Sequence, residues 1–109
     1  MQDVFEVGEV VPITTHRWLV RGQAWQTFRV GDQMYAAVGR SYKTVIENDR
    51  AEGFLVDPGV VSREQPFTVI SVSIYRRDID TLYRGLTGEI ILEGEGGEIL
   101  KENTLLVKL

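Results

Sequence analysis

Three apolar segments of extended character occupy the chain between Pro66 and Leu109, and glycine-marked turns separate them. The first, residues 67–75, is rich in β-branched and aromatic residues and follows a proline, as strands often do. We expect a turn at residues 77–80 after it. A second segment, 90–92, stops at the glycine-rich stretch 94–97, and a third, 104–107, closes the chain. The pattern predicts strands and leaves little room for helix.

The N-terminal part continues this pattern with three further predicted strands, at residues 3–12, 18–25 and 33–38. Gly8 interrupts the first of them, which indicates a β-bulge or a tight bend. About six short strands with glycine-marked turns are typical of an antiparallel barrel or sandwich. We favour an all-β, closed six-stranded antiparallel barrel of the Greek-key type, because closure removes the apolar strand edges that promote aggregation.

Residues 39–66 differ in character, with many charged residues and few apolar ones. The spacing of Tyr42, Val45 and Ile46 allows either one helical turn or a strand. Residues 54–56 indicate a short strand before a turn. We treat 39–66 as an inserted or elaborated loop or hairpin within a single β-barrel domain, 1–109. A long connection of this kind is often functional, although a solvated hairpin capping one end of the barrel is the plainer interpretation.

The composition narrows the class of protein. At 109 residues, 43% hydrophobic and 26% charged, the chain has the profile of one globular domain. Its net charge of −4 disfavours bulk electrostatic binding to nucleic acid, since phosphate binding needs a positive field. The chain has no cysteine, no apparent leader peptide and no apolar run of the roughly 20 residues that a membrane helix requires. We therefore expect a cytoplasmic protein without a membrane partner.

The order of the motifs resembles the second, β-barrel domain of elongation factor Tu and related translation GTPases. Residues 3–5 look like the opening strand of that domain, and residues 20–24 are similar to its V-x-G-x-V strand. Residues 30–32 match its V-G-D/E turn. Residues 82–91, followed by Ile99 and Leu105, are similar to its L-x-x-G/A-x-A-G-D/E-x-V segment and closing strand. The resemblance implies a translation-factor-type barrel over nearly the whole chain, interrupted at 39–66.

Several departures from that family limit what the resemblance implies about function. Residues 10–16 replace the glycine-rich loop of the family, and Asn103 stands where a glycine is usual. No G-x-x-x-x-G-K-S/T phosphate-binding loop is present, so nucleotide hydrolysis is not expected. The glycine-rich stretch 94–97 is interpreted as a plain turn, because Glu95 and Glu98 would repel phosphate.

No set of residues predicts catalysis. His16 is the single histidine, and nothing in the spacing places a hydroxyl partner beside it. Asp78 and Asp80 could begin a calcium site, but no D-x-D-x-D-G loop follows, and a solvated turn with local ion pairs is favoured. We therefore expect a non-enzymatic protein with no catalytic residues, no bound metal and no cofactor.

The arginines are the more informative residues. Nine of the twelve basic residues are arginine, whose planar fork suits phosphate, carboxylate and aromatic partners. Several stand beside aromatic residues, a composition found on both RNA-binding and protein-binding faces. The alternative is that the tryptophans are core residues and the arginines ordinary surface charges. The candidate partner-binding residues are Arg17, Trp18, Arg21, Tyr75, Arg76, Arg77, Tyr83 and Arg84.

Two hypotheses about function follow. The favoured one is a binding or assembly module that mediates protein–protein interaction, with an unknown protein partner or a second copy of itself. The acidic balance and the 39–66 region motivate it. The alternative is an RNA- or ribosome-associated module that uses an arginine and aromatic face. This alternative is implied by the resemblance, because the second domain of the translation factors contacts tRNA and ribosomal RNA.

Overall fold

The computed structural model describes residues 2–109, and almost all of its regular structure is β-strand. The one helical element within this range is a 3₁₀ turn, η1 (Gly97–Ile99). No helix of the described residues is long and apolar enough to span a membrane. The strands are β1 (Gln2–Thr14), β2 (Arg17–Ala24), β3 (Phe28–Arg29), β4 (Gln33–Val38), β5 (Ser41–Glu47), β6 (Arg50–Asp57), β7 (Val60–Val61), β8 (Phe67–Ile74), β9 (Arg77–Ile79), β10 (Thr81–Leu82), β11 (Thr87–Glu93) and β12 (Leu105–Lys108).

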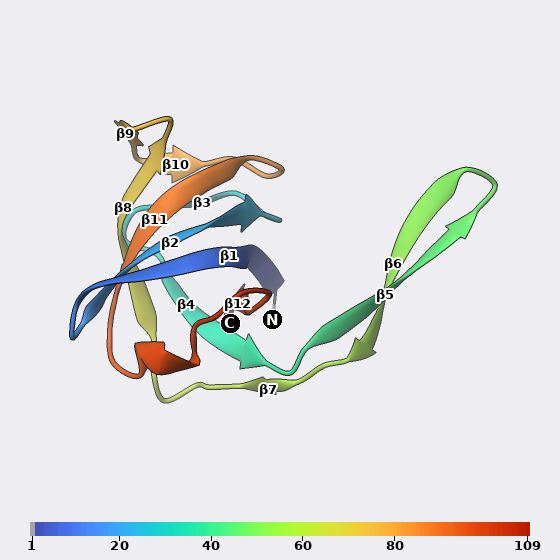
Figure 1. Ribbon diagram of the computed structural model, residues 1–109, viewed down its shortest axis with the longest axis horizontal. Coiled ribbons are helices and arrows are strands. Elements are labelled where there is room, and N and C mark those ends of the chain that lie inside the picture. The colour runs from blue at the N-terminus through green and yellow to red at the C-terminus, as the bar shows by residue number, and fades with distance from the viewer. Residues whose placement is uncertain (1) are drawn as a thin grey trace.

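Six of these strands close into an antiparallel barrel, in the order β4-β12-β1-β2-β11-β8, and a pairing between β8 and β4 completes the circle (Figure 1). Strand β12 returns to lie beside β4, so the strands β4, β8, β11 and β12 have the spatial order of a Greek key. The prediction of an all-β chain with a closed six-stranded barrel is confirmed. Short strands β3 and β10 pair across one end of the barrel.

Irregularities in β1 bend the strand around the barrel. The β1–β2 register shifts between Val7 and Glu9, so the predicted bulge at Gly8 is confirmed. On the facing strand, Gly22 lies so close to β1 that a Cβ atom would stand 2.0 Å from the backbone oxygen of Glu6. A residue without a side chain is therefore required at position 22, where two strands of the curved sheet approach closely.

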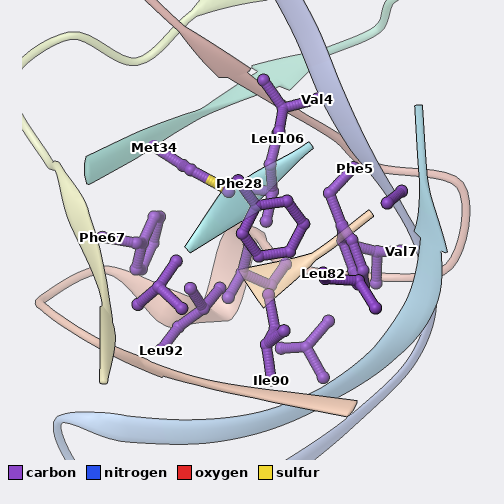
Figure 2. Close-up of a cluster of buried hydrophobic side chains, with 14 of the residues drawn as sticks. Val4, Phe5, Val7, Phe28, Met34, Phe67, Leu82, Ile90, Leu92 and Leu106 are labelled. Atoms are coloured by element: carbon purple, nitrogen blue, oxygen red, sulfur yellow. The ribbon is translucent and has the colours of Figure 1, made fainter. Parts of the chain in front are cut away.

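The barrel interior is filled by side chains from every wall strand (Figure 2). Phe5 and Phe28 meet edge to face, with ring centroids 5.7 Å apart. Such fully buried aromatic and aliphatic side chains each stabilise the fold by about 1.5–3 kcal/mol. The largest are Phe5, Phe28, Phe67, Met34, Leu82, Ile90, Leu92 and Leu106. The interior is a packed core, so partners must be met from outside.

The turn after β8 differs from the sequence prediction. It lies at Tyr75 and Arg76, whose φ angles are 51° and 64°, and residues 77–79 form strand β9. The prediction of a turn at 77–80 was therefore wrong. Two consecutive residues of positive φ make a tight two-residue hairpin, which sequence reasoning associates with Asn or Gly. Tyr75 and Arg76 carry no such signal.

The region 39–66 forms a long hairpin, β5–β6, that projects from the barrel as an arm (Figure 1). Of the two conformations that Tyr42, Val45 and Ile46 allowed, the strand is the one observed. The arm does not cap the barrel, because every residue of both strands is exposed. After the arm, β7 returns along the end of β4.

Candidate partner-binding site

The strand register divides the side chains of the arm between two faces. Directly opposed residues share a face, as Tyr42 does with Leu55 and Ile46 with Ala51. One face, here called the uncharged face, therefore consists of Tyr42, Thr44, Ile46, Ala51, Gly53 and Leu55. Ile46 is 76% exposed there and Leu55 is also exposed to solvent.

The opposite face, here called the charged face, mixes both signs of charge with apolar groups. Its residues line a shallow hollow toward the tip of the arm. Phe54, half-exposed at 50%, forms part of that hollow. The face consists of Lys43, Val45, Glu47, Arg50, Glu52 and Phe54.

The arm is exposed to a degree that an isolated hairpin does not sustain easily. A two-stranded hairpin is only marginally stable in water without a third strand or a packed face. Here neither β5 nor β6 pairs with any other strand of residues 2–109. Exposed apolar groups beside unpaired strand edges mark surfaces where other chains dock or add a strand.

A tight turn ends the arm at Asn48 and Asp49, whose φ angles are 50° and 62°. Two positive φ angles in succession define the hairpin turn that matches the right-handed twist of its strands. Asparagine and aspartate tolerate this left-handed backbone better than other side-chain-bearing residues. The local sequence therefore fixes the register of β5 on β6.

A polar cluster anchors the root of the arm to the barrel. The Asp3 carboxylate, on β1, accepts hydrogen bonds from the Arg40 guanidinium and from the Tyr42 hydroxyl. The Arg40 and Asp3 side chains are only 7% and 11% exposed. Arg40 Nε also donates to the backbone oxygen of Pro58 at 3.0 Å, which joins the two ends of the arm. The Trp25 ring packs on Tyr42 with centroids 5.3 Å apart.

The return of the chain from the arm is equally constrained. Gly59 has a φ of 64°, and a Cβ atom there would lie 2.4 Å from the backbone oxygen of Val38. Its N–H donates to Asp57 Oδ1 at 2.8 Å, which closes an Asx-type turn. Together with the Arg40 cluster, this turn sets the direction in which the arm leaves the barrel.

Partial desolvation raises the pKa of Tyr42, and the hydrogen bond that its hydroxyl donates to Asp3 raises it further. The phenol therefore stays protonated well above neutral pH and keeps donating to the carboxylate. The anchor thus holds its hydrogen bonds over the range in which proteins normally work.

Two of the three candidate residues on β2, Arg17 and Arg21, form ion pairs with neighbouring strands on the outer surface of the barrel. Arg17 Nε pairs with Glu93 at 2.8 Å. Arg21 pairs with Glu89 at 2.7 Å and with Glu9 at 2.8 Å, and these hydrogen bonds, Glu89 first, raise its pKa.

Trp18 lies between these two arginines in the sequence but points into the barrel. It is 7% exposed, and its ring meets Phe67 edge to face at 5.8 Å. Trp18 therefore belongs to the core, which was the alternative left open for the tryptophans.

The other five candidate residues lie in two exposed loops. Tyr75, 95% exposed, and Arg76 form the β8–β9 turn, and Arg77 opens β9. Tyr83 and Arg84 follow β10 and are exposed as well.

The structure gathers only part of the candidate set. Arg21, Tyr75 and Arg76 line one shallow depression, together with Glu89. Arg17 lies four residues from Arg21 along β2 and is outside this group.

Within residues 2–109, no group of three or more histidine, cysteine, aspartate or glutamate side chains could hold a metal ion. His16 lies exposed in the β1–β2 turn, where its backbone N–H donates to Thr14 Oγ1 at 3.2 Å.

Sequence reasoning singled out the region 39–66, which contains the β5–β6 hairpin, but named none of its residues as partner-binding. The available signal was the apolar run at 54–56 together with Tyr42, Val45 and Ile46. A strand of this composition is normally half-buried, and only the fold shows that both faces of this one are open.

A scan against protein-family models gives no match, and a search of the curated proteins gives none either.

Proposed function

We propose that this chain is a non-enzymatic binding or assembly module that mediates protein–protein interaction. In this proposal the barrel is the support and the β5–β6 arm is the binding element. The observation that carries it is the exposed uncharged face on an arm whose root is anchored by Asp3, Arg40 and Tyr42. Because its root is anchored, the arm presents a binding surface at a lower entropic cost than an unanchored loop.

The charges of the arm favour a protein partner over nucleic acid. Its charged face carries two basic residues, Lys43 and Arg50, against two acidic ones, Glu47 and Glu52. The uncharged face has no positively charged group that would neutralise a phosphate. Strand edges and apolar side chains are the features by which proteins recognise one another.

The second candidate function is RNA or ribosome binding, as the resemblance to the second domain of elongation factor Tu implies. The exposed turn of Tyr75 and Arg76 supports it, since aromatic and arginine side chains stack on unpaired bases. Against it, Arg21 at the same depression is already paired with Glu89 and Glu9. Asp78 and Asp80 follow the turn closely and reduce the local positive field.

The two candidates are separated by a photocrosslinking experiment. A photoreactive amino acid is placed either at Ile46, on the uncharged face, or at Tyr75, in the β8–β9 turn. The protein-interaction proposal expects adducts from position 46 that protease destroys and nuclease does not. Nuclease-sensitive adducts from position 75, with none from position 46, would instead support the RNA candidate. Ile13, exposed near the end of β1 and outside both candidate surfaces, is the matched control position.

A further inference from the structure

We infer that the arm binds a second copy of this chain, by antiparallel pairing of β5 with β5 of the other copy around a two-fold axis at Val45. The inference rests on the proposed function and names its partner. It starts from the outer edge of β5. The inner edge of β5 pairs with β6 along its whole length, whereas the outer edge has no strand partner within residues 2–109. Such an edge is a ready template for another strand.

Symmetry restricts how two β5 strands can pair. A two-fold axis perpendicular to the sheet places one residue opposite its own copy, and the neighbours pair outward from it. With Val45 on the axis, Lys43 of each copy lies opposite Glu47 of the second copy. Both residues belong to the charged face, so each cross-strand pair brings opposite charges together on the same side of the sheet.

Other registers of β5 lack this match. With Thr44 on the axis, Lys43 faces Val45 of the second copy, and Glu47 faces Ser41. With Lys43 on the axis, two lysines oppose each other, which is destabilising. Only the register with Val45 on the axis places Lys43 of one copy opposite Glu47 of the other, so that both charged residues of β5 face a residue of opposite charge.

The outer edge of β6 offers a less extensive match than that of β5. With Gly53 on the axis, Glu52 would face Phe54 of the second copy and Arg50 would face Val56. With Phe54 on the axis, Glu52 would face Val56. Both choices leave the charges of β6 without partners. With Ala51 on the axis, Arg50 would face Glu52 of the second copy, but only residues 50–52 of the strand would overlap, against residues 43–47 in the Val45 register of β5. Gly53 also weakens β6 itself. Charge complementarity over the longer paired segment therefore selects β5.

The resulting assembly is a four-stranded sheet in the order β6-β5-β5-β6. Its uncharged face doubles in width, with Tyr42, Ile46 and Leu55 contributed by both copies. Three or more strands with a hydrophobic face form an independently stable sheet, so the pairing remedies the marginal stability of the single arm. Two short strand edges bury less than the roughly 1,200 Å² of a standard interface, so the dimer is expected to depend on protein concentration.

Disulfide trapping tests the register. The chain has no cysteine, so a single Val45→Cys substitution can form a disulfide only between copies. Directly opposed antiparallel residues have Cα atoms about 4.5–5.5 Å apart, within the reach of a disulfide. Phe54→Cys is the matched control, because it lies on the same face of the arm but on β6. Under mild oxidation V45C is expected to give a covalent dimer and F54C to stay monomeric. The opposite result would overturn the inference.

Charge exchange tests the pairing in solution by sedimentation equilibrium. K43E places like charges opposite each other twice per dimer and is expected to raise the dimer dissociation constant about tenfold. The triple variant K43E/E47K/R50E restores opposite charges across the two-fold axis. It includes R50E because Glu47 faces Arg50 within the arm. The triple variant should recover wild-type association, and failure to recover it counts against the register.

The outcomes also separate this inference from the proposed function. A strictly monomeric protein whose position 46 still crosslinks to a different protein overturns self-pairing and leaves the protein-interaction proposal standing. A monomeric protein that forms no protein adduct from position 46 overturns both.

Discussion

At the scale of single residues, Asp3 connects the barrel wall to the arm. It lies on β1, opposite Val107 of β12, and accepts hydrogen bonds from Arg40 and Tyr42 at the root of the arm. Arg40 in turn reaches the backbone of Pro58, where the chain returns. A single carboxylate thus joins the N-terminal strand to both ends of an insertion that begins some forty residues later.

We predict that Arg40→Ala lowers the free energy of unfolding by about 2–3 kcal/mol, because it leaves the largely buried Asp3 carboxylate without its charged partner. Tyr42 continues to donate to Asp3, which keeps the loss below that of a fully orphaned charge. Urea denaturation measures the change. Arg50→Ala, near the exposed tip of the arm, is the control and should have little effect. Equal effects of the two substitutions would contradict the anchor.

The lowered pKa of Asp32 predicts how the free energy of unfolding depends on pH. Partial burial opposes ionisation of its carboxyl, but hydrogen bonds from Lys108 Nζ at 2.6 Å and from the Arg29 N–H at 3.0 Å outweigh it and lower its pKa. A group whose pKa is lower in the folded state stabilises the fold above its unfolded pKa. That stability is lost as the pH falls through the folded pKa.

The unfolding free energy should therefore decline as the pH drops below the ordinary aspartate value of 3.8, and Asp32→Asn should reduce that decline. Urea denaturation across this acidic range measures how the free energy of unfolding depends on pH in the wild type and in each variant. Lys108→Met should flatten the curve as Asp32→Asn does, since it removes the same pair. Identical slopes in the wild type and both variants would rule out this role of Asp32.

At the scale of elements, the outer part of the arm is energetically separate from the barrel. Neither hydrophobic cluster of the protein contains a residue of β5 or β6. The arm makes its barrel contacts at its root, through Tyr42 and the preceding Arg40.

Shortening the arm should therefore leave the barrel intact. Replacing residues 45–52 with an Asn-Gly turn joins Thr44 to Gly53, which already face each other, and keeps the root. We expect the free energy of unfolding to change by no more than about 0.5 kcal/mol, as for other exposed positions. Chemical denaturation followed by circular dichroism measures it. A loss of several kcal/mol would mean that the outer arm supports the barrel.

At the scale of the whole molecule, the barrel was largely predictable. Strand β4 has the predicted bounds, and β8 ends one residue before its predicted limit. The wall strands are rich in β-branched or aromatic residues, and β4 and β11 end at Gly39 and Gly94, so there local pattern and final position agree. The turn at Tyr75 and Arg76 escaped prediction because its positive φ angles are imposed by the pairing of β8 with β9 rather than by its residues.

The candidate site was less predictable, because exposure and pairing depend on distant parts of the chain. Arg17 meets Glu93 and Arg21 meets Glu89 only after β2 and β11 become neighbours. Trp18 is turned inward by the same pairing. By its sequence the arm resembles any other pair of strands. It becomes a candidate site only because no further strand among residues 2–109 pairs with it.

The sequence by itself determined a glycine-punctuated, all-β barrel with one insertion, since periodicity, β propensity and turn chemistry act between near neighbours. Tertiary structure alone decided which arginines are neutralised, which aromatics are buried and that the insertion extends away from the core. Those properties arise from contacts between residues far apart in the chain, and no local pattern contains them.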